Sequence, residues 1–166
     1  KIMATLTADR AADTFPVFKP SGSGNLGVAY GTYALTADPA PADIIEMCKV
    51  PAGAVIVGGH VYAADLDTNA TETFDIDVGW LANGGTGTYD AADDDGLGNF
   101  GVITGDAFAT GNISNVTGVN LPLAGLLVTG VLPAFTKETT LAITVVDDTA
   151  TFTAGSISLV VFYVVP

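Results

Sequence analysis

Four aspartates gather in the short segment at residues 90–96, which reads Asp-Ala-Ala-Asp-Asp-Asp-Gly. They are Asp90, Asp93, Asp94 and Asp95. Hard cations such as Ca²⁺ bind carboxylate and carbonyl oxygens, and the glycines that follow let a loop wrap around an ion. The segment is not an EF-hand, because Ala91 breaks the required alternation and Val102 stands where the closing glutamate belongs. Two interpretations remain open: a calcium site on these four aspartates, or a solvated acidic loop.

The other reactive residue types do not form a catalytic pattern. His60 is the single histidine, and no serine lies in a G-x-S-x-G turn. One histidine and one cysteine cannot fill a usual zinc ligand set. Cys48 sits in the apolar run DIIEMCKV, which favours a buried structural thiol. Carboxylate pairs, as a glycosidase needs, arise by chance in so acidic a chain. We therefore expect no enzyme, and no cofactor other than calcium.

The charge balance excludes some classes of binding partner. The 166 residues include 5 Lys and Arg against 18 Asp and Glu, for a net charge of −13. Nucleic acid is bound mainly through Lys and Arg, so we expect no nucleic-acid partner. The same field disfavours an anionic membrane surface. Hydrophobic residues make up 49% of the chain, but no apolar run reaches the roughly 20 residues that span a bilayer. They must fill a core or subunit interfaces.

The acidic segment follows the clearest strand of the sequence, residues 71–80. Its apolar positions alternate strictly with polar ones, as a strand with one buried face requires. The expected buried set is Phe74, Ile76, Val78 and Trp80. A second strand, rich in β-branched residues, is expected at 54–62, after the Pro-Gly turn of 50–53. The polar loop between them carries Asp65 and Asp67, a weaker calcium candidate.

Further strands are expected along the whole chain. They lie at residues 25–35, 44–50, 139–146 and 156–165, with shorter pieces within 113–127. Residues 36–43 and 81–101 are expected to be loops, the second a long polar one. Residues 160–165 are apolar on both faces, which indicates a central strand or a strand at a subunit interface. Short strands at this spacing, without a long helix, predict an all-β antiparallel β-sandwich. A jelly-roll-like arrangement would pair the first and last strands of its body in one sheet.

The domain organisation is expected to be simple. Residues 1–24 are interpreted as an extended N-terminal arm, and residues 25–166 as a single β-sandwich domain. Phe15, Val17 and Phe18 lie in a segment with two prolines and are too apolar for a free linker. They are therefore interface candidates, which either lie on a neighbouring subunit or pack on their own domain.

A family resemblance adds to this pattern. The strand start VPAGAVIVGG, the alternating strand that ends in DVGW, and the Asp- and Gly-rich segment after it stand in this order. They are followed by GDAFATGNISNVTGVN and by the final strand SISLVVFYVV. This pattern resembles small virion proteins of tailed bacteriophages over residues 44–165. The resemblance implies a jelly-roll-like virion structural protein, a cement or decoration protein on the capsid exterior. It brings no catalytic residues, and the arm lies outside it.

The functional hypothesis that follows is a non-enzymatic capsid cement protein. Such a protein would bind the major capsid protein, bridge neighbouring subunits of the shell and form a homo-oligomer, either a dimer or a trimer. Two other hypotheses stay open. One is a tail or fibre component of the virion. The other is a calcium-dependent carbohydrate-binding or adhesin module, which depends on Trp80 and the aspartates near it.

Overall fold

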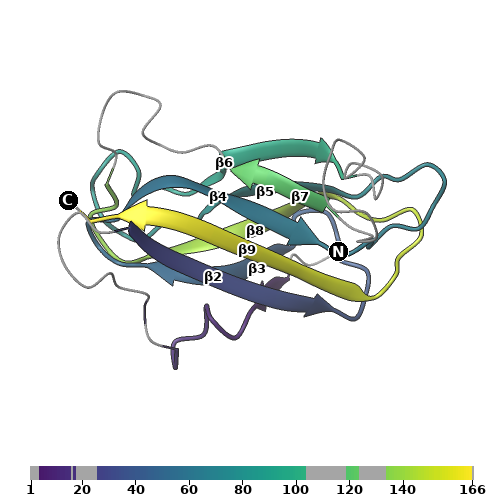
Figure 1. The fold of residues 1–166 in the computed structure, drawn as a ribbon, viewed down its shortest axis with the longest axis horizontal. Helices are drawn as coiled ribbons and strands as arrows, with labels where there is room; N and C mark the ends of the chain where they lie inside the picture. The colour runs from purple at the N-terminus through teal and green to yellow at the C-terminus, as the bar shows by residue number, and fades with distance from the viewer. Residues whose placement is uncertain (1–3, 16, 18–25, 104–118, 124–133, 166) are drawn as a thin grey trace.

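Two β-sheets packed face to face make up the fold (Figure 1). The computed structural model describes residues 4–15, 17, 26–103, 119–123 and 134–165. Nine strands occur among these residues: β1 (Thr5–Thr7), β2 (Leu26–Leu35), β3 (Ile44–Val50), β4 (Val55–Ala63), β5 (Asp75–Trp80), β6 (Asp93–Val102), β7 (Val119–Leu123), β8 (Thr139–Asp147) and β9 (Gly155–Val164). In the part of the chain so described, no helix is long and apolar enough to cross a membrane.

The strands are divided between the sheets as in a jelly roll. Sheet A has the order β1-β3-β8-β5-β6, and sheet B the order β2-β9-β4-β7. The chain changes sheet at almost every connection, and β5 and β6 form the antiparallel hairpin that stays within one sheet. The first and last strands of the body, β2 and β9, pair antiparallel from Leu26–Val164 to Leu35–Gly155. The predicted antiparallel sandwich, with its terminal strands in one sheet, is confirmed.

The core lies between the inner faces of the two sheets. The predicted apolar face of residues 71–80 is part of it, with Phe74, Ile76, Val78 and Trp80 each no more than 2% exposed. They pack with inward side chains of β9, among them Leu159 and Tyr163. β9 lies between β2 and β4, which confirms the central strand predicted near residues 160–165. Cys48 is also buried in this core, as predicted, and burial raises the pKa of its thiol to about 12.

The loop predicted over residues 81–101 is wrong from residue 93 onward, where β6 begins. β6 forms the edge of sheet A and pairs with β5 alone, with register shifts along the pair. Leu97 is the one fully buried side chain of this strand. An edge strand with bulges is held by backbone hydrogen bonds rather than by an alternating apolar face. The hydrophobic pattern used to predict strands is therefore missing from its sequence.

The N-terminal residues lie against sheet A. β1 pairs parallel with β3, and the Ala8 N–H continues the contact by donating to the Glu46 carbonyl at 2.8 Å. Ala8 and Ala11 are each 2% exposed. Lys49 of β3 then forms an ion pair with Asp13 at 2.6 Å. The described start of the arm is thus an additional edge on the sandwich of its own chain.

Candidate functional site

The outer face of sheet B presents an apolar surface built from three neighbouring strands. The antiparallel pairing of β2, β9 and β4 determines which side chains lie next to one another on this face. Leu26 and Val55 flank Val164, Val28 lies beside Phe162, and Tyr30 and His60 flank Val160. Side chains at these positions share one face, because residues alternate along a strand and paired residues lie side by side. We call this surface the sheet B face.

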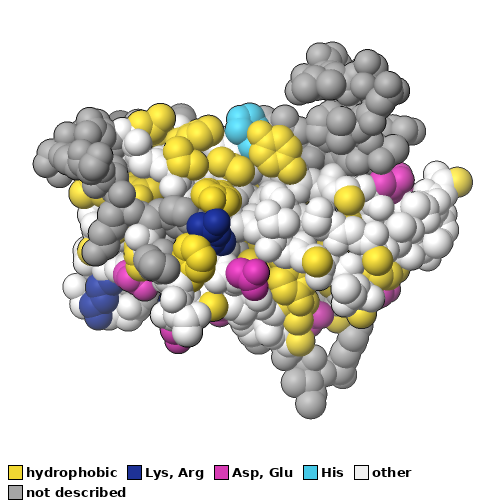
Figure 2. Space-filling model, turned by 60° about the horizontal axis from the view of Figure 1, so that its bottom comes forward, with side chains coloured by type: hydrophobic (Ala, Val, Ile, Leu, Met, Phe, Trp, Pro, Cys, Tyr) yellow, Lys and Arg dark blue, Asp and Glu magenta, His cyan; other side chains and the backbone are white. Residues whose placement is uncertain are grey.

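Most of its large side chains are exposed or half-buried, although Val55 is buried. Leu26 is 60% exposed, Val28 42%, and Tyr30 and Tyr62 41% each. The rings of His60 and Phe162 meet edge to face with centroids 6.3 Å apart, so the aromatic groups form one continuous patch. Figure 2 shows hydrophobic side chains gathered around the single histidine of the chain. A contiguous exposed apolar patch marks an interaction surface.

The sheet B face also differs in charge from the rest of the molecule. The strands of sheet B contain no aspartate or glutamate, although the chain has 18. The strands of sheet A contain the carboxylates Glu46, Asp75, Asp77, Asp93, Asp94, Asp95 and Asp147. The acidic charge is therefore separated from the apolar face, as an interface that must lose its water requires.

One interface candidate of the arm, Phe15, lies beside this face. The Arg10 guanidinium is 4.3 Å from the centre of the Phe15 ring and 4.4 Å from that of Tyr30, so one cation bridges the arm and β2. Val17 is half-buried, and Phe18 lies outside the described residues. The arm thus meets the sheet B face at Tyr30. This face was not predicted from the sequence, although the apolar positions of residues 25–35 and 160–165 were the signal for it.

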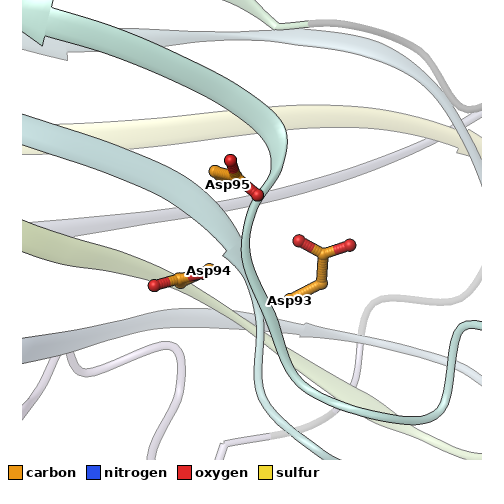
Figure 3. A group of neighbouring side chains, drawn as sticks. All are labelled: Asp93, Asp94 and Asp95. Atoms are coloured by element: carbon orange, nitrogen blue, oxygen red, sulfur yellow. The ribbon is translucent and has the colours of Figure 1, made fainter.

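The aspartates of residues 90–96 divide into two groups. Asp93, Asp94 and Asp95 lie at the start of β6, and each offers a carboxylate oxygen within 4.8 Å of the others (Figure 3). Burial raises the pKa of Asp93, and the carboxylates of Asp95 and Asp94 raise it further. These three are the part of the predicted calcium set that the fold brings together.

Asp90 lies apart from them and is 2% exposed. One of its oxygens accepts from Asn83 Nδ2 at 2.7 Å and from the Thr136 N–H at 2.9 Å. The other accepts from the Gly87 N–H at 2.6 Å and from the Thr136 hydroxyl. These donors, the Thr136 hydroxyl first, hold the pKa of Asp90 well below its usual range. Asp90 therefore ties the β5–β6 connection to the segment before β8.

Asp67 makes a similar tie at another pair of loops. Its four accepted hydrogen bonds come from backbone N–H groups, those of Asn69, Thr73, Ala150 and Thr151, at 2.8–3.2 Å. Burial alone would raise its pKa, but the four donors outweigh burial and lower the pKa to about 2. Asp67 thus joins the loop after β4 to the loop after β8. Asp65 does not share this role, since its buried Oδ1 has no partner in the described structure.

Trp80 has no role at the surface. It is 2% exposed, packs edge to face on Phe135 with centroids 5.3 Å apart, and donates from Nε1 to the Ala91 carbonyl at 2.9 Å. A buried indole cannot stack on a sugar ring. The interpretation of Trp80 as support for a carbohydrate site is therefore wrong.

Comparison with solved structures places this fold among phage capsids. The chain is similar to a chain of the capsid of Ralstonia phage GP4, with a TM-score of 0.74 and 22% identity over 98% of this chain and 99% of that one. It is also similar to a chain of the capsid asymmetric unit of cyanophage Pam1, with a TM-score of 0.62 and 26% identity over 93% and 96%. These comparisons support a virion structural protein of a bacteriophage.

A third similar chain is from the acid-stable capsid of Helicobacter pylori bacteriophage KHP30, with a TM-score of 0.52 and 13% identity over 87% of this chain and 91% of that one. At this identity, and at that of the Ralstonia phage chain, the likeness concerns the fold. No family model and no curated protein matches the chain. All three likenesses nevertheless extend over nearly the whole of both chains, so the sandwich itself is what they share.

Proposed function

We propose that the protein is a capsid cement protein that binds the outside of the shell and bridges neighbouring major capsid subunits. The observation that carries this proposal is the sheet B face, an exposed apolar surface without carboxylates on a chain of net charge −13. The likeness of the whole chain to chains of phage capsids supports the same proposal. A protein with this role acts by binding alone, without an active site.

The net negative charge supports binding to the outer rather than the inner surface of the shell. Packaged DNA is a dense polyanion, and a chain with 18 acidic and 5 basic residues would be repelled by it. On the exterior, the same charge keeps many copies soluble and apart, while the sheet B face turns toward the shell.

The size of the face indicates how the binding must work. Three neighbouring strands of about ten residues cover roughly 500 Å², from the usual strand spacing and rise. A standard stable interface buries about 800 Å² on each partner. The sheet B face is therefore enough for a modest contact, and the arm beside Tyr30 would have to enlarge it. Oligomerisation as a dimer or trimer would add avidity, because linked copies bind a repeating shell together.

Co-sedimentation with shells of the parent phage, stripped of this protein, tests the proposal. Saturable pelleting at a fixed ratio to the shell protein is expected. The ratio also separates a dimer at two-fold positions from a trimer at three-fold positions. A protein that stays in the supernatant contradicts the cement role, and isolated tails would then be the next partner to test.

Two matched valines locate the contact. Val28 on the sheet B face is 42% exposed, and Val146 on the opposite side of the sandwich is 44% exposed. Val28→Lys puts a charge that must lose its water into the contact, and we expect shell affinity to fall about tenfold or more. Val146→Lys makes the same chemical change outside the contact and should leave affinity unchanged. Lysine lowers the net negative charge, so a loss at Val28 cannot come from added repulsion between acidic partners. Equal binding by both variants would exclude the sheet B face.

A further inference from the structure

His60 lies at the centre of the sheet B face. Its neighbour Val61 is in the core, so alternation along β4 turns the imidazole outward. Pairing with Val160 of β9 places His60 in one row with Tyr30 of β2. Two outward positions of β2 precede Tyr30 and two follow it, so this row is the middle of the face. A partner that covers the sheet B face must therefore cover His60.

Apolar groups surround the imidazole. Its ring centre is 5.9 Å from that of Tyr62 and 6.3 Å from that of Phe162. The side chain is half-buried, and Figure 2 shows it at the surface among hydrophobic side chains. The centre of an interface loses its water more completely than the rim does. Binding would thus take away the water that still reaches this imidazole.

The strands of sheet B offer His60 no opposite charge. Their sequences contain no Asp, Glu, Lys or Arg. The other titratable groups that face His60 from these strands are the phenols of Tyr62 on β4 and Tyr30 on β2, and phenols are neutral below about pH 9. β7, which pairs with β4 at Pro122, has no titratable side chain. The arm brings the Arg10 guanidinium over Tyr30, and its charge has the same sign as protonated histidine.

We propose that His60 makes binding to the shell dependent on pH. This inference rests on the proposed function. Imidazole is the side chain whose charge ordinarily changes between about pH 5 and 8. In the free protein, water solvates the charged ring at the surface. In the contact, the cation would be buried among apolar groups without a counterion from its own sheet. The shell surface opposite His60 is then apolar and lacks a carboxylate, so neutral His60 permits binding and protonation releases the protein.

Co-sedimentation with stripped shells at two pH values tests this inference. A complex that excludes one proton loses affinity by up to about tenfold for each pH unit. We expect the affinity of the wild type to fall about tenfold or more from about pH 7.5 to about pH 5.5. Equal or tighter binding at the lower pH overturns the role of His60 and leaves the cement role intact. A wild type that does not pellet even at the higher pH contradicts the cement role, and this inference with it.

Two substitutions at the same position separate the imidazole from other groups that titrate. His60→Phe keeps an aromatic ring and takes no proton, so it should bind equally well at both pH values. His60→Lys carries its charge at both, so it should bind weakly at both. If His60→Phe loses as much affinity at about pH 5.5 as the wild type does, groups other than His60 cause the loss and the proposal fails.

A displaced histidine separates the position of the charge from the net charge. Val146 is 44% exposed on the opposite side of the sandwich. The double variant His60→Phe, Val146→His gains the same charge on acidification, but outside the contact, and its binding should not depend on pH. Binding as dependent on pH as that of the wild type overturns the proposal.

The free protein provides a measurement without shells. His60 is the single histidine of the chain, so the imidazole resonances in a proton NMR spectrum belong to it alone. They should shift with pH between about pH 5 and 8, and the histidine of the double variant should do the same. An imidazole of the wild type that takes up no proton in this range overturns the proposal, whatever the shells show.

Discussion

Asp67 and Asp77 have nearly the same burial and opposite electrostatics. They are 2% and 8% exposed. Four backbone N–H groups converge on Asp67 and lower its pKa to about 2, against the effect of burial. Asp77 has an oxygen without a donor, and burial together with three neighbouring carboxylates raises its pKa. Burial alone therefore does not decide whether a carboxylate stabilises this fold; the groups that surround it do.

The difference separates carboxylates that join loops from carboxylates that lack donors. Asp67 and Asp90 each join two loops, and their lone pairs are used within the protein. In sheet A, by contrast, Asp77 keeps a buried oxygen without a donor, and Asp93, Asp94 and Asp95 bring three carboxylates together.

Replacing Asp67 should have the largest effect on stability. In Asp67→Asn a single carbonyl oxygen replaces the two that accept from four N–H groups, so buried donors lose their partners. We expect the free energy of unfolding to fall by about 3 kcal/mol, as for other buried charged networks. Urea denaturation measures this. Asp65→Asn is the control, because it lies in the same loop and its Oδ1 has no partner to lose. Equal stability of the two variants would contradict the role given to Asp67.

Lowering the pH should weaken the same contact of Asp67. The pKa of Asp67 is lowered from 3.8 to about 2 in the folded protein, so the folded state binds this proton less readily than the unfolded state. Its contribution to stability is therefore complete above pH 3.8 and is lost as the pH falls toward 2. Melting temperatures measured across this window should fall more steeply in the wild type than in Asp67→Asn. Parallel curves would show that Asp67 is not responsible.

The sequence predicts the parts of this fold that depend on side-chain alternation. Residues 71–80 and 156–165 have a clear apolar face, because they pack across the core. Strands form there as Asp75–Trp80 and Gly155–Val164, so the first begins four residues later than predicted. β1 and β6 were not identified, since both lie at edges of sheet A and are held by backbone pairing. Nothing in the order of residues 93–102 marks a strand that bulges over its neighbour.

The candidate sites were less predictable for a similar reason. The acidic run at residues 90–96 was visible, but its division was not, because the donors to Asp90 include Thr136, 46 residues away. Asp77 looked like an ordinary polar position on the wet face of a strand. Its side chain is nevertheless only 8% exposed, which the local pattern does not show. The sheet B face could not be predicted, because the register of three strands determines which of their apolar residues are neighbours.

The smallest predicted effect has the opposite sign to that at Asp67. Asp77→Asn removes one of several like charges, because the carboxylates of Asp75, Asp95 and Asp94 all raise the pKa of Asp77. It should therefore raise the free energy of unfolding by up to about 1 kcal/mol. Urea denaturation at neutral pH measures the difference. An Asp77→Asn variant less stable than the wild type would mean that the Asp77 carboxylate has a partner in the fold, and the contrast with Asp67 would disappear.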